Sequence, residues 1–174
     1  PAVEGGLIVA EDAAMAARLR RLRSHGLDRP IERSEPGFNA RMDELRATIA
    51  LHTLGRYGAA LDRRRAYGAR FRDAVGRTGG VLVNQARPAG VATNYVNFPV
   101  HVPRPGPGGI DAVATLFSAA GVQTRRYFHP PLHHLEIFRG HPTLPVTDRL
   151  CEGMLCLPVH GRMAEEALVC IEAA

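Results

Sequence analysis

The segment DELRATIALHTLGRYGAALDRRRAYGARFRDAV, residues 43–75, decides the fold of this chain of 174 residues. Its apolar side chains recur every three or four positions, the spacing that places them along one side of a helix. They include Leu45, Ile49, Leu54, Leu61, Phe71 and Val75. Asp43 is the predicted N-cap, because a carboxylate can accept hydrogen bonds from the first backbone N–H groups. Gly55 and Gly58 each weaken a helix by about 1 kcal/mol, so we predict a bend or break there.

Shorter elements are predicted on both sides of this helix. Upstream we expect a strand at 7–10, a helix capped by Asp12 and ended by Gly26, and a polar loop at 27–41. Downstream we expect strands at 81–83, 95–102 and 122–125, and helices at 110–120 and 164–171. Pro99 has no N–H to donate, so its strand should lie at an edge or carry a bulge. The alternation of strands and helices indicates the α/β class, or α+β for the second half.

Composition and charge narrow the possible partners. Hydrophobic residues make up 45% and charged residues 22%, as in ordinary globular proteins. No apolar run approaches the roughly 20 residues that span a bilayer, so no membrane partner is expected. The net charge of +5 would allow a nucleic-acid partner, but the arginine runs at 18–23 and 63–65 are typical of solvated helix faces, and we expect none. The three cysteines form no CxxC pair. We therefore expect them to be small buried residues of a protein in the reducing cytoplasm.

The stretch RRYFHPPLHHLEIFRGH, residues 125–141, contains four histidines and two adjacent prolines. Pro130 and Pro131 exclude a helix that would present histidines at positions i and i+4. Glu136 is the only carboxylate nearby, and no HExxH pattern is present, so we predict no metal site. Two interpretations remain: a packed loop with hydrogen-bonded histidines, or a loop that faces a substrate. Imidazole and phenol groups suit the hydroxyls or phosphates of a sugar substrate.

A second candidate site is GFNARMDEL, residues 37–45. Asn39 and Arg41 precede the predicted helix, where an amide, a guanidinium and the positive end of the helix together suit an anion. A plain capping loop is the alternative. All 22 basic residues of the chain are arginine, so no residue of this chain can form a Schiff base.

Six segments, taken in order, resemble the DegT/DnrJ/EryC1/StrS aminotransferases, which use pyridoxal phosphate to aminate keto sugars carried on nucleotides. The segments are EGGLIVAED (4–12), AARLRRLRSHG (16–26), GFNARMDELRATIAL (37–51), NYVNFPV (94–100), GVQTRRYFHPPLH (121–133) and LCLPVH (155–160). The resemblance implies a fold type I aminotransferase. Residues 1–60 would end the large cofactor-binding domain and begin the inter-domain helix, and residues 61–174 would form the small C-terminal domain. The Schiff-base lysine would lie just before Pro1.

The resemblance also implies roles for individual residues. Asn39 matches the asparagine that reaches the cofactor phosphate of the neighbouring subunit, which implies a homodimer with shared active sites. Arg41 matches an arginine near the substrate entrance, and Tyr127, Phe128 and His129 match the loop that lines the sugar side of the pocket.

The implied reaction moves an amino group from a donor such as glutamate to a nucleotide-linked keto sugar, in the biosynthesis of deoxyamino sugars, including those of antibiotics. The form RRYFHP favours a dTDP-4-keto-6-deoxyhexose. Related alternatives are a pyridoxal-phosphate-dependent dehydratase, in which histidine replaces the lysine, and a cyclitol aminotransferase. Outside enzymes, the alternative is a basic nucleic-acid-binding regulatory protein, whose binding would fall steeply with salt.

Overall fold

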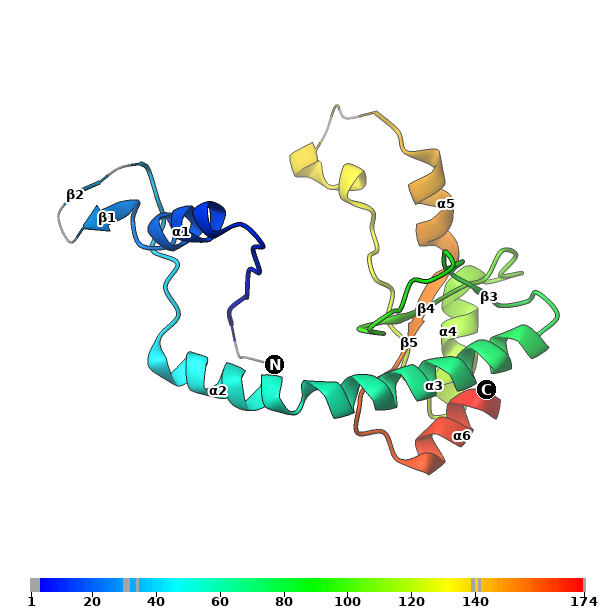
Figure 1. Cartoon of the computed structure of the whole chain (residues 1–174). Coiled ribbons are helices and arrows are strands. Elements are labelled where there is room, and N and C mark those ends of the chain that lie inside the picture. Colours follow the sequence, from blue (N-terminus) through cyan, green and yellow to red (C-terminus); the bar gives the residue numbers. More distant parts are fainter. Residues whose placement is uncertain (1–3, 30–31, 34, 139, 141, 174) are drawn as a thin grey trace. The chain divides into compact units, whose positions relative to one another are not determined.

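The computed structural model describes residues 4–29, 32–33, 35–138, 140 and 142–173 (Figure 1). The chain divides into two compact units, Pro1–Gly58 and Ala59–Ala174. Sequence analysis placed a domain boundary at residue 60. That the first unit is the end of a larger cofactor-binding domain stays a prediction. None of the helices in the described part of the chain is long and apolar enough to cross a bilayer.

The first unit begins with helix α1, Ala13–Leu22, and ends in helix α2, Glu44–Gly55. Both predicted N-caps are confirmed. The Asp12 carboxylate accepts from the N–H groups of Ala14 and Met15, each at 3.0 Å, and Asp43 accepts from Arg46 N–H at 2.8 Å. The cap residue Arg56 ends α2, and α3, Tyr57–Arg77, starts at once. The predicted break in the long helical pattern is therefore confirmed.

Two predictions about strands in the first unit were wrong. Residues 7–10 form no strand; Leu7, Ile8 and Val9 are 72–83% exposed, and no described strand pairs with them. Apolar β-branched residues favour a strand, but a strand also needs a neighbour to accept its backbone hydrogen bonds. The loop at 27–41 contains a short antiparallel pair, β1 (Leu27–Arg29) and β2 (Glu32–Arg33).

The second unit is built on a three-stranded antiparallel sheet in the order β3-β4-β5. The strands are β3 (Val83–Asn84), β4 (Phe98–His101) and β5 (Met154–Leu157). The helices of this unit are α3, α4 (Gly109–Ala119), α5 (Pro145–Gly153) and α6 (Glu165–Ala173), with 3-10 turns η1 (Leu132–His134) and η2 (Glu136–Phe138). An antiparallel sheet with helices packed against it makes this unit α+β.

The core of the second unit lies on one face of this sheet. The directly opposed pairs Phe98–Leu157 and Val100–Leu155 point to the same face because side chains alternate along each strand. Helices α3, α4 and α6 cover it with Phe71, Val75, Ile110, Phe117, Leu168 and Ile171. Phe71 is 1% exposed and meets Phe98 edge-to-face, with the ring centroids 5.4 Å apart.

The middle position of β4 and its regular pairing with β5 correct the prediction that Pro99 marks an edge strand or a bulge. The Val102 N–H donates to Gly153 O at 2.8 Å on the β5 side, and the direction of N–H groups alternates along a strand. The nitrogen of Pro99 therefore faces the β3 side. There β3 has already ended, because its last residue Asn84 lies opposite Val100. Proline is tolerated because no ladder bond is due at that position.

The remaining differences are local. The predicted strand at 122–125 is reduced to one bridge, in which the backbones of Arg125 and Cys156 exchange hydrogen bonds of 3.1 and 2.7 Å. Helix α5 was not predicted. Cys156 is buried, as expected for a cysteine used as a small apolar residue, and burial raises the pKa of its thiol.

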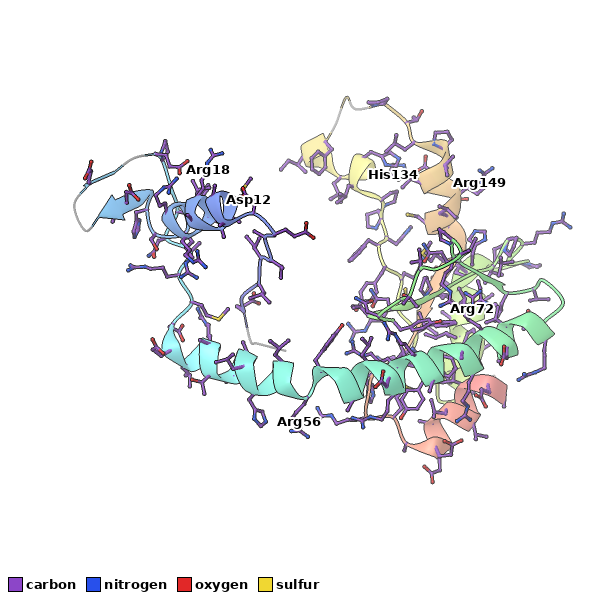
Figure 2. All side chains as sticks on the ribbon, in the orientation of Figure 1. Asp12, Arg18, Arg56, Arg72, His134 and Arg149 are labelled. Carbon is purple, nitrogen blue, oxygen red and sulfur yellow. The ribbon has the colours of Figure 1, made fainter. Side chains whose placement is uncertain are left out.

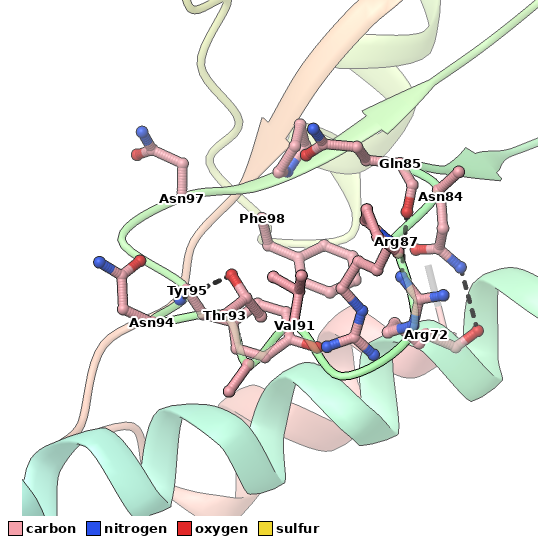
Figure 3. A pocket seen from close by; sticks show the side chains of 14 residues that line it. Arg72, Asn84, Gln85, Arg87, Val91, Thr93, Asn94, Tyr95, Asn97 and Phe98 are labelled. Atoms are coloured by element: carbon pink, nitrogen blue, oxygen red, sulfur yellow. Dashed lines mark hydrogen bonds between the residues drawn. The ribbon is translucent and has the colours of Figure 1, made fainter.

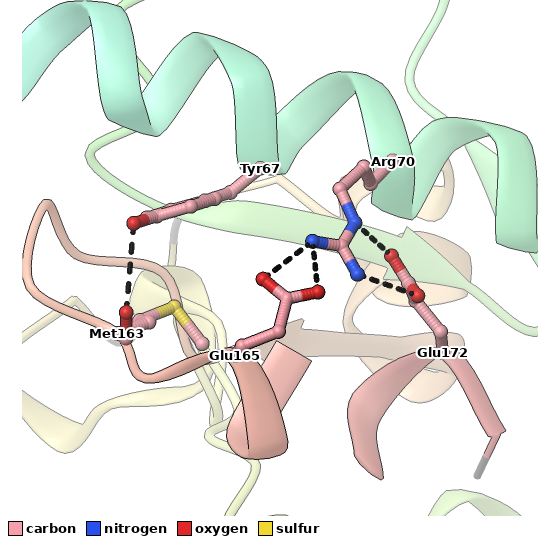
Figure 4. Close-up of polar contacts among 5 residues, drawn as sticks. All are labelled: Tyr67, Arg70, Met163, Glu165 and Glu172. Carbon is pink, nitrogen blue, oxygen red and sulfur yellow. Dashed lines mark hydrogen bonds and ion pairs between the residues drawn. The ribbon is translucent and has the colours of Figure 1, made fainter. Parts of the chain in front are cut away.

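An ion-pair network ties α6 to α3 (Figure 4). Arg70 donates through Nε to Glu172 at 2.6 Å and through Nη1 to Glu165 at 2.8 Å. The hydrogen bonds from Arg70 lower the pKa of the Glu172 carboxyl. Tyr67 OH adds a long contact of 3.5 Å to Met163 O. These contacts fix the last helix against the core.

Candidate functional site

The loop that carries Asn39 is held by main-chain hydrogen bonds in the first unit. The N–H groups of Phe38 and Ala40 donate to Leu22 O and Arg23 O at 2.7 and 2.9 Å. Asn39 itself forms a bridge with Ser24, and its side chain is exposed. Among the described residues, no hydrogen bond holds the Asn39 amide. The backbone is thus fixed while the amide can bind a ligand.

Two glycines allow this close approach of loop and helix end. Gly26 has a φ of +73°, and an added Cβ would collide with the backbone of Glu35. A Cβ on Gly37 would collide with the backbone of Gly26. The helix itself ends at Leu22, so Gly26 is not the C′ residue that we predicted. It serves instead as the contact point for the loop.

Beside this loop lies an open cavity of about 800 Å³ whose charged lining is mainly arginine. Its guanidinium groups come from Arg20, Arg23, Arg41 and Arg46, and Glu4 is the one carboxylate in the described lining. A planar guanidinium group can donate two parallel hydrogen bonds to the oxygens of one carboxylate or phosphate group. This cavity therefore suits an anionic ligand. Figure 2 shows the side chains of this unit, including Asp12, the N-cap of α1, and Arg18 on α1.

Only part of this lining could be found from the sequence. Arg41 was predicted, and it lies in the cavity wall. Arg20 and Arg23 were interpreted as a solvated helix face, although their spacing of three residues already placed them on one side of α1. Arg46 was overlooked. It lies three residues after Asp43 and pairs with that carboxylate at 3.4 Å.

Tyr127, Phe128 and His129 lie together in one loop of the second unit. Arg125 Nη1 donates to Tyr127 OH at 3.2 Å, and Arg126 Nη2 lies 3.2 Å from His129 Nδ1. Since guanidinium can only donate, His129 Nδ1 must accept, and the neutral ring carries its proton on Nε2. Phe128 is 75% exposed. The loop therefore offers a phenol, an imidazole donor and an apolar ring.

Arg126, which sequence reasoning missed, fixes this loop to the rest of the second unit. Besides His129, it contacts Asp111 Oδ1 of α4 at 3.3 Å and Cys151 O of α5 at 3.0 Å. The Cys151 thiol in turn lies 3.3 Å from Phe128 O. The loop is thus held to two helices, whereas Asn39 and Arg41 belong to the first unit.

A separate cavity of about 370 Å³ adjoins β4 (Figure 3). Arg72 Nη1 donates to Gln85 O at 3.2 Å, and Asn84 Nδ2 donates to Arg72 O at 3.3 Å. The guanidinium of Arg87 lies 5.6 Å from the centre of the Tyr95 ring. Arg72 and Asn84 hold the cavity wall together, and neither was singled out from the sequence.

The histidine stretch acquires a carboxylate partner through the fold. Asp148 Oδ1 in α5 lies 2.8 Å from His133 Nε2 and 3.0 Å from His134 Nε2. Sequence analysis considered only Glu136. Asp148 follows His133 by 15 residues, which is not the spacing of a known metal-binding motif. The packing of η1 beside α5 brings the two side chains together.

Proteins of similar sequence and fold include enzymes named as sugar aminotransferases. The chain is 26% identical over 173 residues to dTDP-4-amino-4,6-dideoxy-D-glucose transaminase of Escherichia coli, covering 95% of this chain and 46% of that protein. It is 31% identical over 168 residues to UDP-N-acetyl-3-dehydro-alpha-D-glucosamine 3-aminotransferase of Acidithiobacillus ferrooxidans, covering 95% and 43%. The structure of DesI with its TDP-sugar product matches with a TM-score of 0.81 and 32% identity, over 99% of this chain and 44% of that one.

The chain thus spans less than half the length of these relatives. The family model that matches residues 2–173 is that of the DegT/DnrJ/EryC1/StrS aminotransferase family. This match covers all six segments whose resemblance was noted in the sequence. The chain belongs to the DegT/DnrJ/EryC1/StrS aminotransferase family.

Proposed function

We propose that the protein containing this chain transfers an amino group from an amino-acid donor such as glutamate to a nucleotide-linked keto sugar, with pyridoxal phosphate as its cofactor. The observation that carries this proposal is the fixed Asn39 loop beside the arginine-lined cavity. Cofactor and nucleotide sugar are both phosphate esters, and this is the kind of surface that binds them. The names of the relatives support the substrate class, since they include transaminases of dTDP-sugars and an aminotransferase of a UDP-sugar.

The residues of this chain fit one end of the cofactor. The chain has no lysine and cannot hold the aldehyde covalently, but the Asn39 amide can donate to a phosphate oxygen. Following the family resemblance, we assign Arg41 to the substrate entrance. When bound, pyridoxal phosphate supplies the electron sink for amino-group transfer. Following the family resemblance, we assign Asn39 to the phosphate of the neighbouring subunit's cofactor, which makes the active protein a homodimer with shared sites.

We assign the Tyr127–His129 loop to the sugar. Tyr127 OH and His129 Nε2–H can hydrogen-bond sugar hydroxyls or the keto oxygen, and the exposed ring of Phe128 offers an apolar surface to the deoxy carbon. Arg126 positions His129 through the contact to Nδ1. The form of this loop favours a dTDP-4-keto-6-deoxyhexose, and two of the relatives are named as enzymes of dTDP-sugars aminated at carbon 4.

The two half-reactions provide the test. Excess glutamate added to the full protein with bound cofactor should remove the visible absorbance of the cofactor, and a dTDP-4-keto-6-deoxyhexose should restore it. A cyclitol ketone that restores the absorbance better would favour the cyclitol alternative. An absorbance insensitive to glutamate, with loss of a sugar hydroxyl in the product, would favour the dehydratase.

A further inference from the structure

The cluster of His133, His134 and Asp148 lies outside the residues assigned above. His134 is labelled in Figure 2, at the turn η1. The two Nε2 atoms share one carboxylate oxygen, and one donor atom from each of the three residues lies within 4.8 Å of the others. The two imidazole rings meet edge-on at an interplanar angle of 70°, with centroids 4.4 Å apart. Three metal-ligating groups therefore converge on one point.

The backbone fixes each of these groups before any ligand binds. Pro131 precedes η1, and His134 N–H donates back to Pro131 O at 2.9 Å, which closes the turn. On the other side, Asp148 lies in the first turn of α5, and its N–H donates to Leu144 O at 2.9 Å. The side chain of His133 is only 7% exposed, so its rotamer is restricted by packing. The three groups are preorganised, which reduces the entropic cost of binding.

We propose that His133, His134 and Asp148 form a binding site for a divalent transition-metal ion of the zinc type. Two imidazole nitrogens and one carboxylate oxygen are a ligand set that zinc and its first-row neighbours accept, with a further position left for water. Magnesium and calcium prefer oxygen ligands and are disfavoured by two imidazoles. The His134 side chain is 52% exposed and gives the ion a route from solvent.

The two nitrogen-to-oxygen distances are close to those of a filled site. Zinc lies about 2.0–2.2 Å from nitrogen and oxygen ligands, which in a tetrahedron puts neighbouring ligand atoms about 3.3 Å apart. The two nitrogen-to-oxygen distances of 2.8 and 3.0 Å would open by only a few tenths of an ångström. Each Nε2 must be unprotonated to bind the ion, so each neutral imidazole would then carry its single proton on Nδ1. The ion would then join η1 to α5 and anchor the chain that follows the Tyr127–His129 loop.

The test uses the full protein, stripped with a chelator and saturated with cofactor, and Zn²⁺ as the probe. Calorimetric titration should show one saturable site per chain. His134→Gln and Asp148→Asn should each lower the affinity of that site by more than the 10–100-fold typical of losing an outer-sphere partner. His52→Gln, at an exposed histidine of α2, is the matched control and should bind like wild type. Because the side chain of His133 is only 7% exposed, its replacement is not used.

A second measurement distinguishes zinc bound at this site from zinc bound elsewhere on the protein. Zn²⁺ should raise the melting temperature of wild type and His52→Gln but not of His134→Gln, since only ions bound to the native state stabilise it. Co²⁺ in place of zinc should give the visible bands of a four-coordinate site, and these should be lost in His134→Gln. Equal Zn²⁺ affinity in wild type and both cluster variants, or no saturable binding at all, would overturn the proposal.

Discussion

Replacing Asn39 by alanine separates ligand binding from loop structure. The main chain of this loop is held by Leu22 O and Arg23 O, and the amide of Asn39 has no described partner. The substitution should therefore change the free energy of unfolding by no more than about 0.5 kcal/mol. A hydrogen bond to a charged phosphate contributes about 1.5–3 kcal/mol, so cofactor affinity should fall by roughly tenfold to a hundredfold.

The assay is titration of pyridoxal phosphate into the apo-form of the full protein, with the fraction of dimer followed by sedimentation. If Asn39 reaches across the dimer interface, the variant should also lose the extra dimer stability that the cofactor gives to wild type. Asn97→Ala removes an exposed amide from the second unit and is the control, which should behave like wild type. Unchanged cofactor affinity in an intact Asn39→Ala dimer would refute the assignment.

Three further predictions concern other parts of the chain. Borohydride reduction of the cofactor-loaded protein should leave no adduct on residues 1–174, which contain no lysine; a modified peptide from this range would contradict the account. Arg126→Ala should raise KM for the nucleotide sugar by about 2–10-fold, the value of one hydrogen bond, with cofactor affinity unchanged as the check that the effect is confined to the Tyr127–His129 loop. Glu172→Gln should lower the melting temperature at pH 7 by about 2–4 °C. Because the pKa of Glu172 is lowered in the folded state, its contribution should fade as pH drops through that pKa, and a difference from wild type that persisted in strong acid would argue against it.

The parts of the fold that depend on local signals were predictable. Asp12 and Asp43 cap helices because a carboxylate satisfies N–H groups two or three residues away, which is a property of the sequence itself. The break between α2 and α3 follows from glycines that weaken the helix at its middle. These features need no information about the rest of the molecule.

Several of the failures depend on partners that are distant in sequence. Residues 7–10 have strand propensity, but a strand exists only where another strand pairs with it. Pro99 favoured an edge position for its strand. Proline is nevertheless tolerated in the central strand, because β3 ends before it could pair with Pro99. Asp148 could not be identified from the sequence as a partner of His133, because the two meet only through the packing of η1 against α5. Position in the sheet and side-chain convergence are tertiary properties.

The most direct test of the proposed function is transfer of labelled nitrogen. The full protein, with pyridoxal phosphate, [¹⁵N]glutamate and a dTDP-4-keto-6-deoxyhexose, should yield a nucleotide sugar carrying ¹⁵N, detected by mass spectrometry. The same sugar without glutamate should be unchanged. A nucleotide sugar recovered without ¹⁵N, either intact or lacking a hydroxyl, would contradict the assignment of this protein as a sugar aminotransferase.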